Sequence, residues 1–179
     1  MNWTVPGLSA LLLLAGCSPA LDWRTVPLEG ARVTALLPCK PEHAVRPVAL
    51  GGEGAPPVDL ALTGCDADGA TFAVSHAAWA APQEAGAQLA RWRAAVQARM
   101  QAGLALAEQP FVPAGALALP QSVRVALQGQ RADGTPVHAQ AVWFARLEGA
   151  QARLVHAVVY SAAPRPDVAD TFFAGLSLP

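Results

Sequence analysis

The sequence is poor in charged residues and contains almost no lysine. Asp, Glu, Lys and Arg make up 14% of the 179 residues, and the formal net charge is −1. Lys40 is the only lysine. Proteins that bind nucleic acid generally present a basic surface that neutralises phosphates. The near-neutral charge therefore argues against nucleic acid as a partner.

Long apolar runs are also missing. A transmembrane helix needs about 20 consecutive apolar residues, whereas the apolar run at residues 8–15 is much shorter. That run begins close to the first methionine, and small residues and Ser18-Pro19 follow it, as expected of a removable signal. We therefore expect a cleaved signal at the N-terminus and no transmembrane helix.

Familiar catalytic motifs are absent from the chain. It has no Gly-x-Ser-x-Gly elbow, no His-Glu-x-x-His zinc motif and no phosphate-binding loop with its lysine. His76 and His156 fall in different expected strands and are able to form a metal site or an acid/base pair if they meet across a sheet. Structural, hydrogen-bonded histidines are the commoner case. We expect no enzymatic activity, no metal and no cofactor.

Leu14-Ala15-Gly16-Cys17 closes the apolar run and resembles the lipobox of bacterial lipoproteins. In that family the cysteine thiol receives a diacylglycerol, the preceding bond is cut, and the new amino terminus is acylated. The resemblance implies a signal peptide at residues 1–16 and a lipid anchor on Cys17; ordinary cleaved secretion is the alternative. Two or more acyl chains give stable anchoring. Ser18 implies, by the sorting pattern of enteric bacteria, an outer-membrane location facing the periplasm.

Cys39 and Cys65 are the two cysteines left after Cys17, and an even pair in an oxidising compartment favours a disulfide. Neither belongs to a Cys-x-x-Cys motif or has a histidine at a familiar metal-ligand spacing. A reactive or metal-binding pair is the less favoured alternative. In the chain-entropy description such a bridge contributes about 3–4 kcal/mol.

Apolar periodicity predicts a single α+β domain at residues 31–179, preceded by a short tether at residues 17–30. Asp66 and Asp68 with Gly69 predict a hairpin turn, because the acidic pattern of a calcium loop does not continue. Pro82 opens a helix of about 20 residues with one apolar stripe that includes Trp92. Alternation predicts strands over residues 32–37, 45–50, 58–63, 72–76, 123–128, 137–147 and 153–161, and a short helix follows at 167–175.

The order of these elements resembles the PsbP-like superfamily. The resemblance rests on Leu37-Pro38-Cys39-Lys40-Pro41-Glu42, on the long helix with Trp92, and on the ending Thr171-Phe172-Phe173-Ala174-Gly175-Leu176. It implies a sandwich of about six to seven antiparallel strands with one long helix and one short C-terminal helix. It also implies an accessory or binding protein without catalytic residues. A cystatin-like sheet and helix is the alternative fold.

Adjacent aromatic residues provide the candidate binding surface. Trp143 and Phe144 lie on opposite faces of one long expected strand, and one helix layer covers only one face. Either the terminal helix covers the second aromatic, or an exposed patch marks a partner or ligand site. Phe111, in an apolar connector at residues 110–120, is a further candidate. We expect an envelope protein partner, with a small apolar ligand or lipid as the alternative and an envelope hydrolase third.

Overall fold

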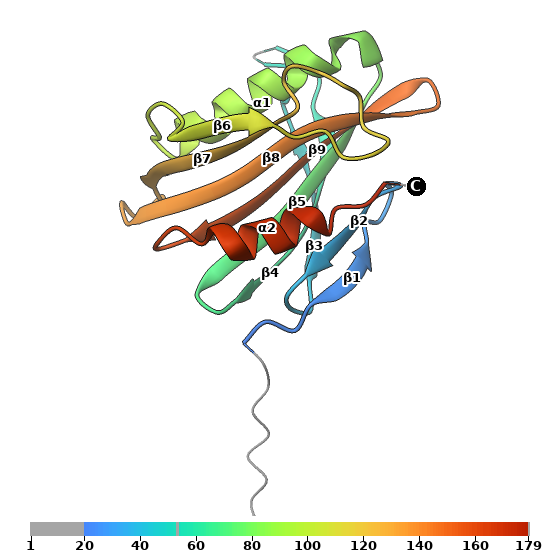
Figure 1. Cartoon of the computed structure of the whole chain (residues 1–179). Coiled ribbons are helices and arrows are strands. Elements are labelled where there is room, and N and C mark those ends of the chain that lie inside the picture. The colour runs from blue at the N-terminus through green and yellow to red at the C-terminus, as the bar shows by residue number, and fades with distance from the viewer. Residues whose placement is uncertain (1–19, 53, 179) are drawn as a thin grey trace, which may run out of the picture.

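A seven-stranded antiparallel sheet forms the centre of the molecule, which is known from a computed structural model (Figure 1). The structure describes residues 20–52 and 54–178, so the expected lipobox and Cys17 lie outside the described residues. The strand order is β3 (Glu42–Val48), β4 (Val58–Ala67), β5 (Ala70–Trp79), β9 (Gln151–Ser161), β8 (Pro136–Glu148), β7 (Val123–Gln130) and β6 (Ala107–Pro110).

Helices and a small second sheet cover the two faces of this large sheet. Helix α1 (Ala85–Arg99), preceded by the short 3-10 helix η1 (Pro82–Glu84), packs on β8 and β9 from one side. Helix α2 (Pro166–Ala174) and the pair β1 (Arg24–Pro27) and β2 (Thr34–Leu37) lie on the other side (Figure 1). The expected α+β class, with an antiparallel sheet, one long helix and a short C-terminal helix, is confirmed. No helix among the described residues has the length and apolar character needed to cross a membrane.

Burial on both faces of β8 and β9 creates two apolar cores. The core under α1 contains Leu89, Trp92, Trp143 and Leu154. The core under α2 contains Phe144, together with Phe72, Val155 and Phe172. Alternate residues of a strand point to opposite faces, so neighbouring residues of β8 enter different cores. The predicted positions of Trp92 and of the two adjacent aromatics on opposite faces are confirmed.

The β4–β5 hairpin forms where Asp66 to Gly69 predicted a turn. Ala67 pairs with Ala70, which leaves Asp68 and Gly69 as a two-residue loop. Both have positive φ, 49° and 71°, as a type I′ turn requires. Glycine adopts that conformation without the steric cost of a side chain, so the sequence here specifies the turn directly.

Two short strands were not expected from the sequence. Residues 24–27, expected in the tether, form β1 and pair with β2, and Leu28 is only 2% exposed. The tether expectation is therefore corrected from residue 24 onward. Strand β6, which ends at the first residue of the expected connector, pairs with β7 although all four of its residues are exposed.

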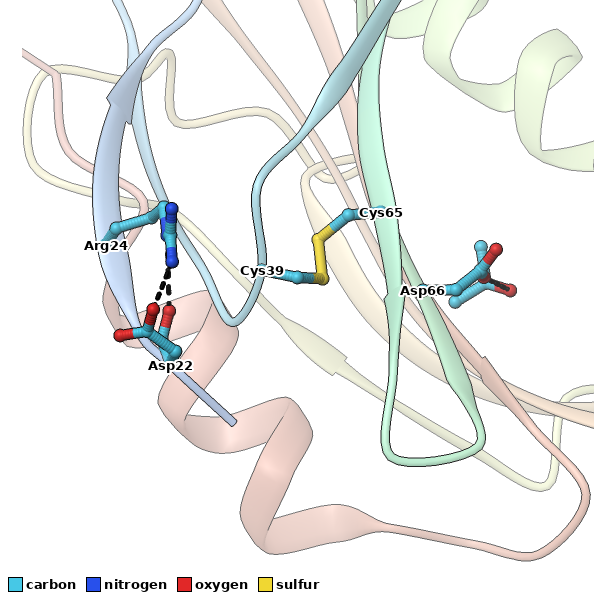
Figure 2. The surroundings of a disulfide bond; sticks show 6 residues. Asp22, Arg24, Cys39, Cys65 and Asp66 are labelled. Atoms are coloured by element: carbon cyan, nitrogen blue, oxygen red, sulfur yellow. Dashed lines mark hydrogen bonds and ion pairs between the residues drawn. A yellow bond between two sulfur atoms is a disulfide. The ribbon is translucent and has the colours of Figure 1, made fainter. Parts of the chain in front are cut away.

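The predicted disulfide joins Cys39 and Cys65 (Figure 2). Their Cα atoms are 6.0 Å apart, and 26 positions separate them in the chain. Cys39 follows β2 and Cys65 lies in β4, so the bond connects the small sheet's exit to the large sheet. Asp66 points away from the bond, to the other face of β4 (Figure 2). The disulfide thus links the small β1–β2 sheet covalently to the large sheet.

We expect the Cys39→Ser/Cys65→Ser double variant to lose about 3–4 kcal/mol of unfolding free energy, because its unfolded chain regains the freedom of the closed loop. Urea denaturation followed by tryptophan fluorescence measures the loss. The wild-type protein in excess reductant serves as a control and should fall to the stability of the variant. An unchanged midpoint in both samples contradicts this role of the disulfide.

Candidate functional site

The aromatic residues proposed as a surface do not form one. Trp143 and Phe144 are both 0% exposed. Trp143 stacks on His156 at a centroid distance of 4.4 Å, under α1. Phe144 lies 6.0 Å from the half-buried Phe111, which also packs beside Phe173 of α2. The exposed-patch interpretation of Trp143 and Phe144 is wrong, because each side of the sheet has its own covering layer.

His76 and His156 point to opposite faces of the sheet and do not meet. In the register of β5 and β9, His76 is opposite Val155, and Ser75 is opposite His156. Directly opposed residues share a face, so His76 belongs to the α2 side and His156 to the α1 side. A shared metal site or acid/base pair between them is therefore excluded by geometry. Within residues 20–52 and 54–178, no group of three or more His, Cys, Asp or Glu side chains is placed to hold a metal ion.

His156 is enclosed by aromatic rings in the α1-side core. Trp143 stacks against it, and the Trp92 ring lies edge-on at 5.5 Å. Its Nε2 atom and the Trp143 Nε1 atom have no hydrogen-bond partner among the described side chains and backbone. Burial lowers the pKa of His156 to about 3. The ring is therefore neutral at physiological pH and serves as a packing element of the core.

A partly buried ionic cluster lies on the α2 side at the end of the β8–β9 hairpin. Arg146 and Arg153 are directly opposite each other, and Glu148 is the acidic partner of both. Glu148 Oε2 accepts from Arg153 Nε at 2.9 Å, and Oε1 accepts from the Arg32 backbone N–H at 3.1 Å. Arg146 Nη1 donates to the Arg32 carbonyl at 2.6 Å. The Glu148 carboxylate therefore compensates the positive charges of Arg146 and Arg153 and also binds the β1–β2 loop through the Arg32 N–H.

The ionisation of this cluster follows from its contacts. Burial alone disfavours the Glu148 carboxylate, but the Arg32 N–H and the nearby guanidinium groups outweigh it, and the net effect lowers the pKa of Glu148. Burial and the positive charge of Arg153 lower the pKa of His76. Arg153 approaches His76 Nδ1 at 3.4 Å. Since a guanidinium only donates, Nδ1 accepts and the ring is neutral. This arrangement suits structural support better than proton transfer.

Part of the large sheet is left open where α1 does not extend over it. On the α1 side, β3 and β4 with the start of β5 form a hollow of about 510 Å³. The hollow exists because α1 packs on β8 and β9 and does not cover the part of the sheet formed by β3 and β4. We call this hollow the β3–β4 groove.

Small residues form the floor of the β3–β4 groove. Gly64 of β4 lies directly opposite Ala73 of β5, and Ala44 of β3 lies one pair further along the same face, opposite Leu62. Gly64 has no room for a larger residue, because a Cβ atom there would lie 2.6 Å from the Phe72 carbonyl oxygen. Leu62, next to this floor, is 40% exposed. An apolar residue beside a floor of small side chains leaves space for side chains of another molecule.

Charged residues surround this apolar floor. Acidic and basic side chains both line the rim, namely Lys40, Glu42, Arg46 and Asp66. An apolar centre with a polar rim is the usual anatomy of a protein-binding surface. Both signs of charge are present, so the rim suits a protein segment of mixed charge better than a polyanion.

A smaller hollow lies at the C-terminal end of α1. Its volume is about 250 Å³, and Met100, Val137, Tyr160, Arg99 and Arg131 contribute to its lining. Small-molecule sites usually occupy about 300–1,000 Å³. This hollow is therefore small for a lipid, although its apolar lining and two arginines match a short amphipathic anion.

The groove was not anticipated from the sequence. Alternation of Val58, Leu60 and Leu62 predicted a strand with one apolar face, which is a signal for burial. Whether a helix covers that face depends on which strands α1 crosses, and this is a property of the tertiary fold. Gly64 inside a strand was the one local signal, since an interior glycine often marks a close approach.

We expect stability to decrease as the pH falls from 6.5 toward 3, because unfolded His156 binds a proton that the folded chain excludes. The slope from this one group is about 1.4 kcal/mol per pH unit, fully developed between the two pKa values. His76 adds to it with the same sign. His156→Phe keeps an aromatic ring and should flatten the slope by one proton. Urea titrations at several pH values measure it, and an unchanged slope contradicts the assignment.

We expect Glu148→Gln to destabilise the protein by about 2–3 kcal/mol, because it leaves Arg146 and Arg153 without their shared carboxylate. Asp170→Asn is the matched control. It removes the ion pair of Arg124 with an exposed carboxylate, and should cost at most about 1 kcal/mol. Denaturant midpoints compare the two variants. Equal effects of the two substitutions on stability contradict the role given to the partly buried cluster.

Comparisons with known proteins give no relative to guide a functional assignment. The chain was compared with models of protein families, with curated protein sequences and with solved structures, and no match was found. Function must therefore be inferred from the geometry of the described residues, above all from the β3–β4 groove.

Proposed function

We propose that the chain is a non-catalytic lipoprotein of the bacterial envelope that binds a protein partner through the β3–β4 groove. The observation that carries the proposal is the open half of the α1-side face. It combines an exposed Leu62, a floor of small residues and a charged rim. Such a combination favours protein contacts. The lipobox-like segment ending at Cys17 supports the envelope location.

Anchoring at Cys17 would keep the groove close to a membrane surface. Seven positions separate Cys17 from Arg24, where β1 begins. An extended chain covers at most about 3.3–3.6 Å per residue, so this connection reaches roughly 25 Å. The start of β1 would therefore lie within that distance of the anchor, and a partner of the groove would be a membrane-associated or periplasmic envelope protein. Outer-membrane attachment, facing the periplasm, is the location we propose.

A small-ligand function is the second candidate. The hollow of about 250 Å³ beside Tyr160 supports it, because Met100 and Val137 provide apolar contacts and Arg131 provides charge. Burial raises the pKa of the Tyr160 hydroxyl, which keeps that group protonated as a hydrogen-bond donor. The hollow is smaller than the β3–β4 groove, so protein binding is the function that we favour.

We expect a photo-crosslinking amino acid at Leu62 to join the anchored protein to one dominant envelope protein in cells. The same probe at Ala98, on the exposed side of α1, is the matched control and should give no such product. In a second strain, with the probe at Lys40 on the groove rim, Leu62→Asp should abolish the product, since it places a charge on the apolar floor. Circular dichroism verifies folding of the variant.

Mass spectrometry of the crosslinked product identifies the partner. Equal products from the probes at Leu62 and Ala98 contradict a specific groove. If a product of twice the chain's own mass is the only one, the crosslinked neighbour is a second copy of the chain, which contradicts a different protein as the occupant of the groove.

A further inference from the structure

Strand β3 is an open edge of the large sheet. The strand order ends with it, and its far side has no neighbour among the described strands. Val45 in the middle of the strand is 65% exposed. An edge of this kind offers backbone N–H and C=O groups to another strand unless the sequence blocks it. The charges and prolines of β3 restrict which strand fits.

Proline positions reveal which backbone groups of β3 face outward. In an antiparallel pair, alternate residues exchange hydrogen bonds with the neighbouring strand. Pro47 pairs in register with Asp59 of β4 but has no N–H to donate. Pro47 therefore belongs to the set that faces away from β4, together with His43 and Val45. The N–H and C=O groups of His43 and Val45 are directed to the open edge.

We propose that β3 pairs antiparallel with β3 of a second copy of this chain, about a two-fold axis at Ala44. In this register Glu42 lies opposite Arg46 of the other copy, and the symmetry repeats the pair. His43 lies opposite Val45, so each copy donates and accepts through both of these residues. Opposite charges directly across an antiparallel pair stabilise it. The two sheets then become one continuous sheet, joined by an isologous interface.

Neighbouring registers are less favourable on the same residues. A two-fold axis at His43 places Arg46 opposite Lys40, which brings like charges together, and places Pro41 opposite Val45. An axis at Val45 places Pro47 opposite His43, so donors are lost, and it pairs Arg46 with Ala44. If the two-fold axis lay between two residues, backbone groups that point toward the second copy would face groups that point toward β4. Such a register forms no regular pattern of hydrogen bonds. Only the axis at Ala44 combines donors with complementary charge.

The pairing also accounts for the exposed side chains of β3. Val45 would contact the His43 ring of the second copy on the α2 side of the sheet. Ala44 lies at the axis, where its small side chain lets the two strands approach closely. The axis is perpendicular to the sheet, so both β3–β4 grooves lie on the same side of the dimer. The self-association does not require the heterologous partner proposed above.

Charge exchange is the first test of this dimer. Sedimentation velocity on the purified full chain, with Cys17→Ser to prevent lipidation and thiol crosslinking there, should show a concentration-dependent dimer. Glu42→Arg should weaken it roughly tenfold or more, as should Arg46→Glu, because each replaces two attractive pairs by two repulsive ones. The double variant Glu42→Arg/Arg46→Glu should restore it. Glu29→Arg, away from β3, is the control and should leave the dimer unchanged.

Disulfide trapping is the second test and reports on the register itself. In the Cys17→Ser chain, Ala44→Cys should form a covalent dimer under mild oxidation, since residues at the axis have closely spaced Cβ atoms. Arg46→Cys should not, because its partner position is Glu42. A chain that stays monomeric at all concentrations overturns the proposal. A double charge variant that fails to recover, or equal trapping at both positions, overturns it as well.

Discussion

Burial of β8 and β9 on both faces is the constraint on which the rest of the structure depends. Successive residues Trp143 and Phe144 are fully buried in different cores. Neither α1 nor α2 alone can therefore bury both side chains. The α1 side uses a histidine as a neutral aromatic, and the α2 side adds a small sheet and an ionic cluster. Because α1 packs over the central strands, the α1-side face of β3 and β4 remains uncovered.

Local signals in the sequence predicted the local parts of this structure. The Asp68-Gly69 turn, the helix opened by Pro82 and the Cys39–Cys65 bond all depend on residue types whose conformational or chemical preferences are strong. Strand β1 was missed because its apolar content is low and its place is set by pairing with β2. Strand β6 was missed for the same reason: its residues are exposed, and only the neighbouring β7 defines it.

Features that depend on the register between paired strands could not be predicted from the sequence. A histidine in each of two strands is compatible with a shared face or with opposite faces, and a shift of one residue changes the answer. The pairing of Ser75 with His156 decides it here. The groove depends similarly on how far α1 extends across the sheet. The sequence therefore predicted most of the strands of the large sheet, but not which of their side chains meet.

The disulfide would have a mechanical consequence if the chain is held by its N-terminal end, as proposed above. Tension entering at residue 20 follows the backbone through β1 and β2 to Cys39, and there the covalent bond passes it directly to Cys65 in β4. Residues 40–64, which include all of β3 and most of β4, form a closed side loop outside this load path. The open edge and most of the groove would keep their shape while the attachment is pulled, as long as the bond is oxidised.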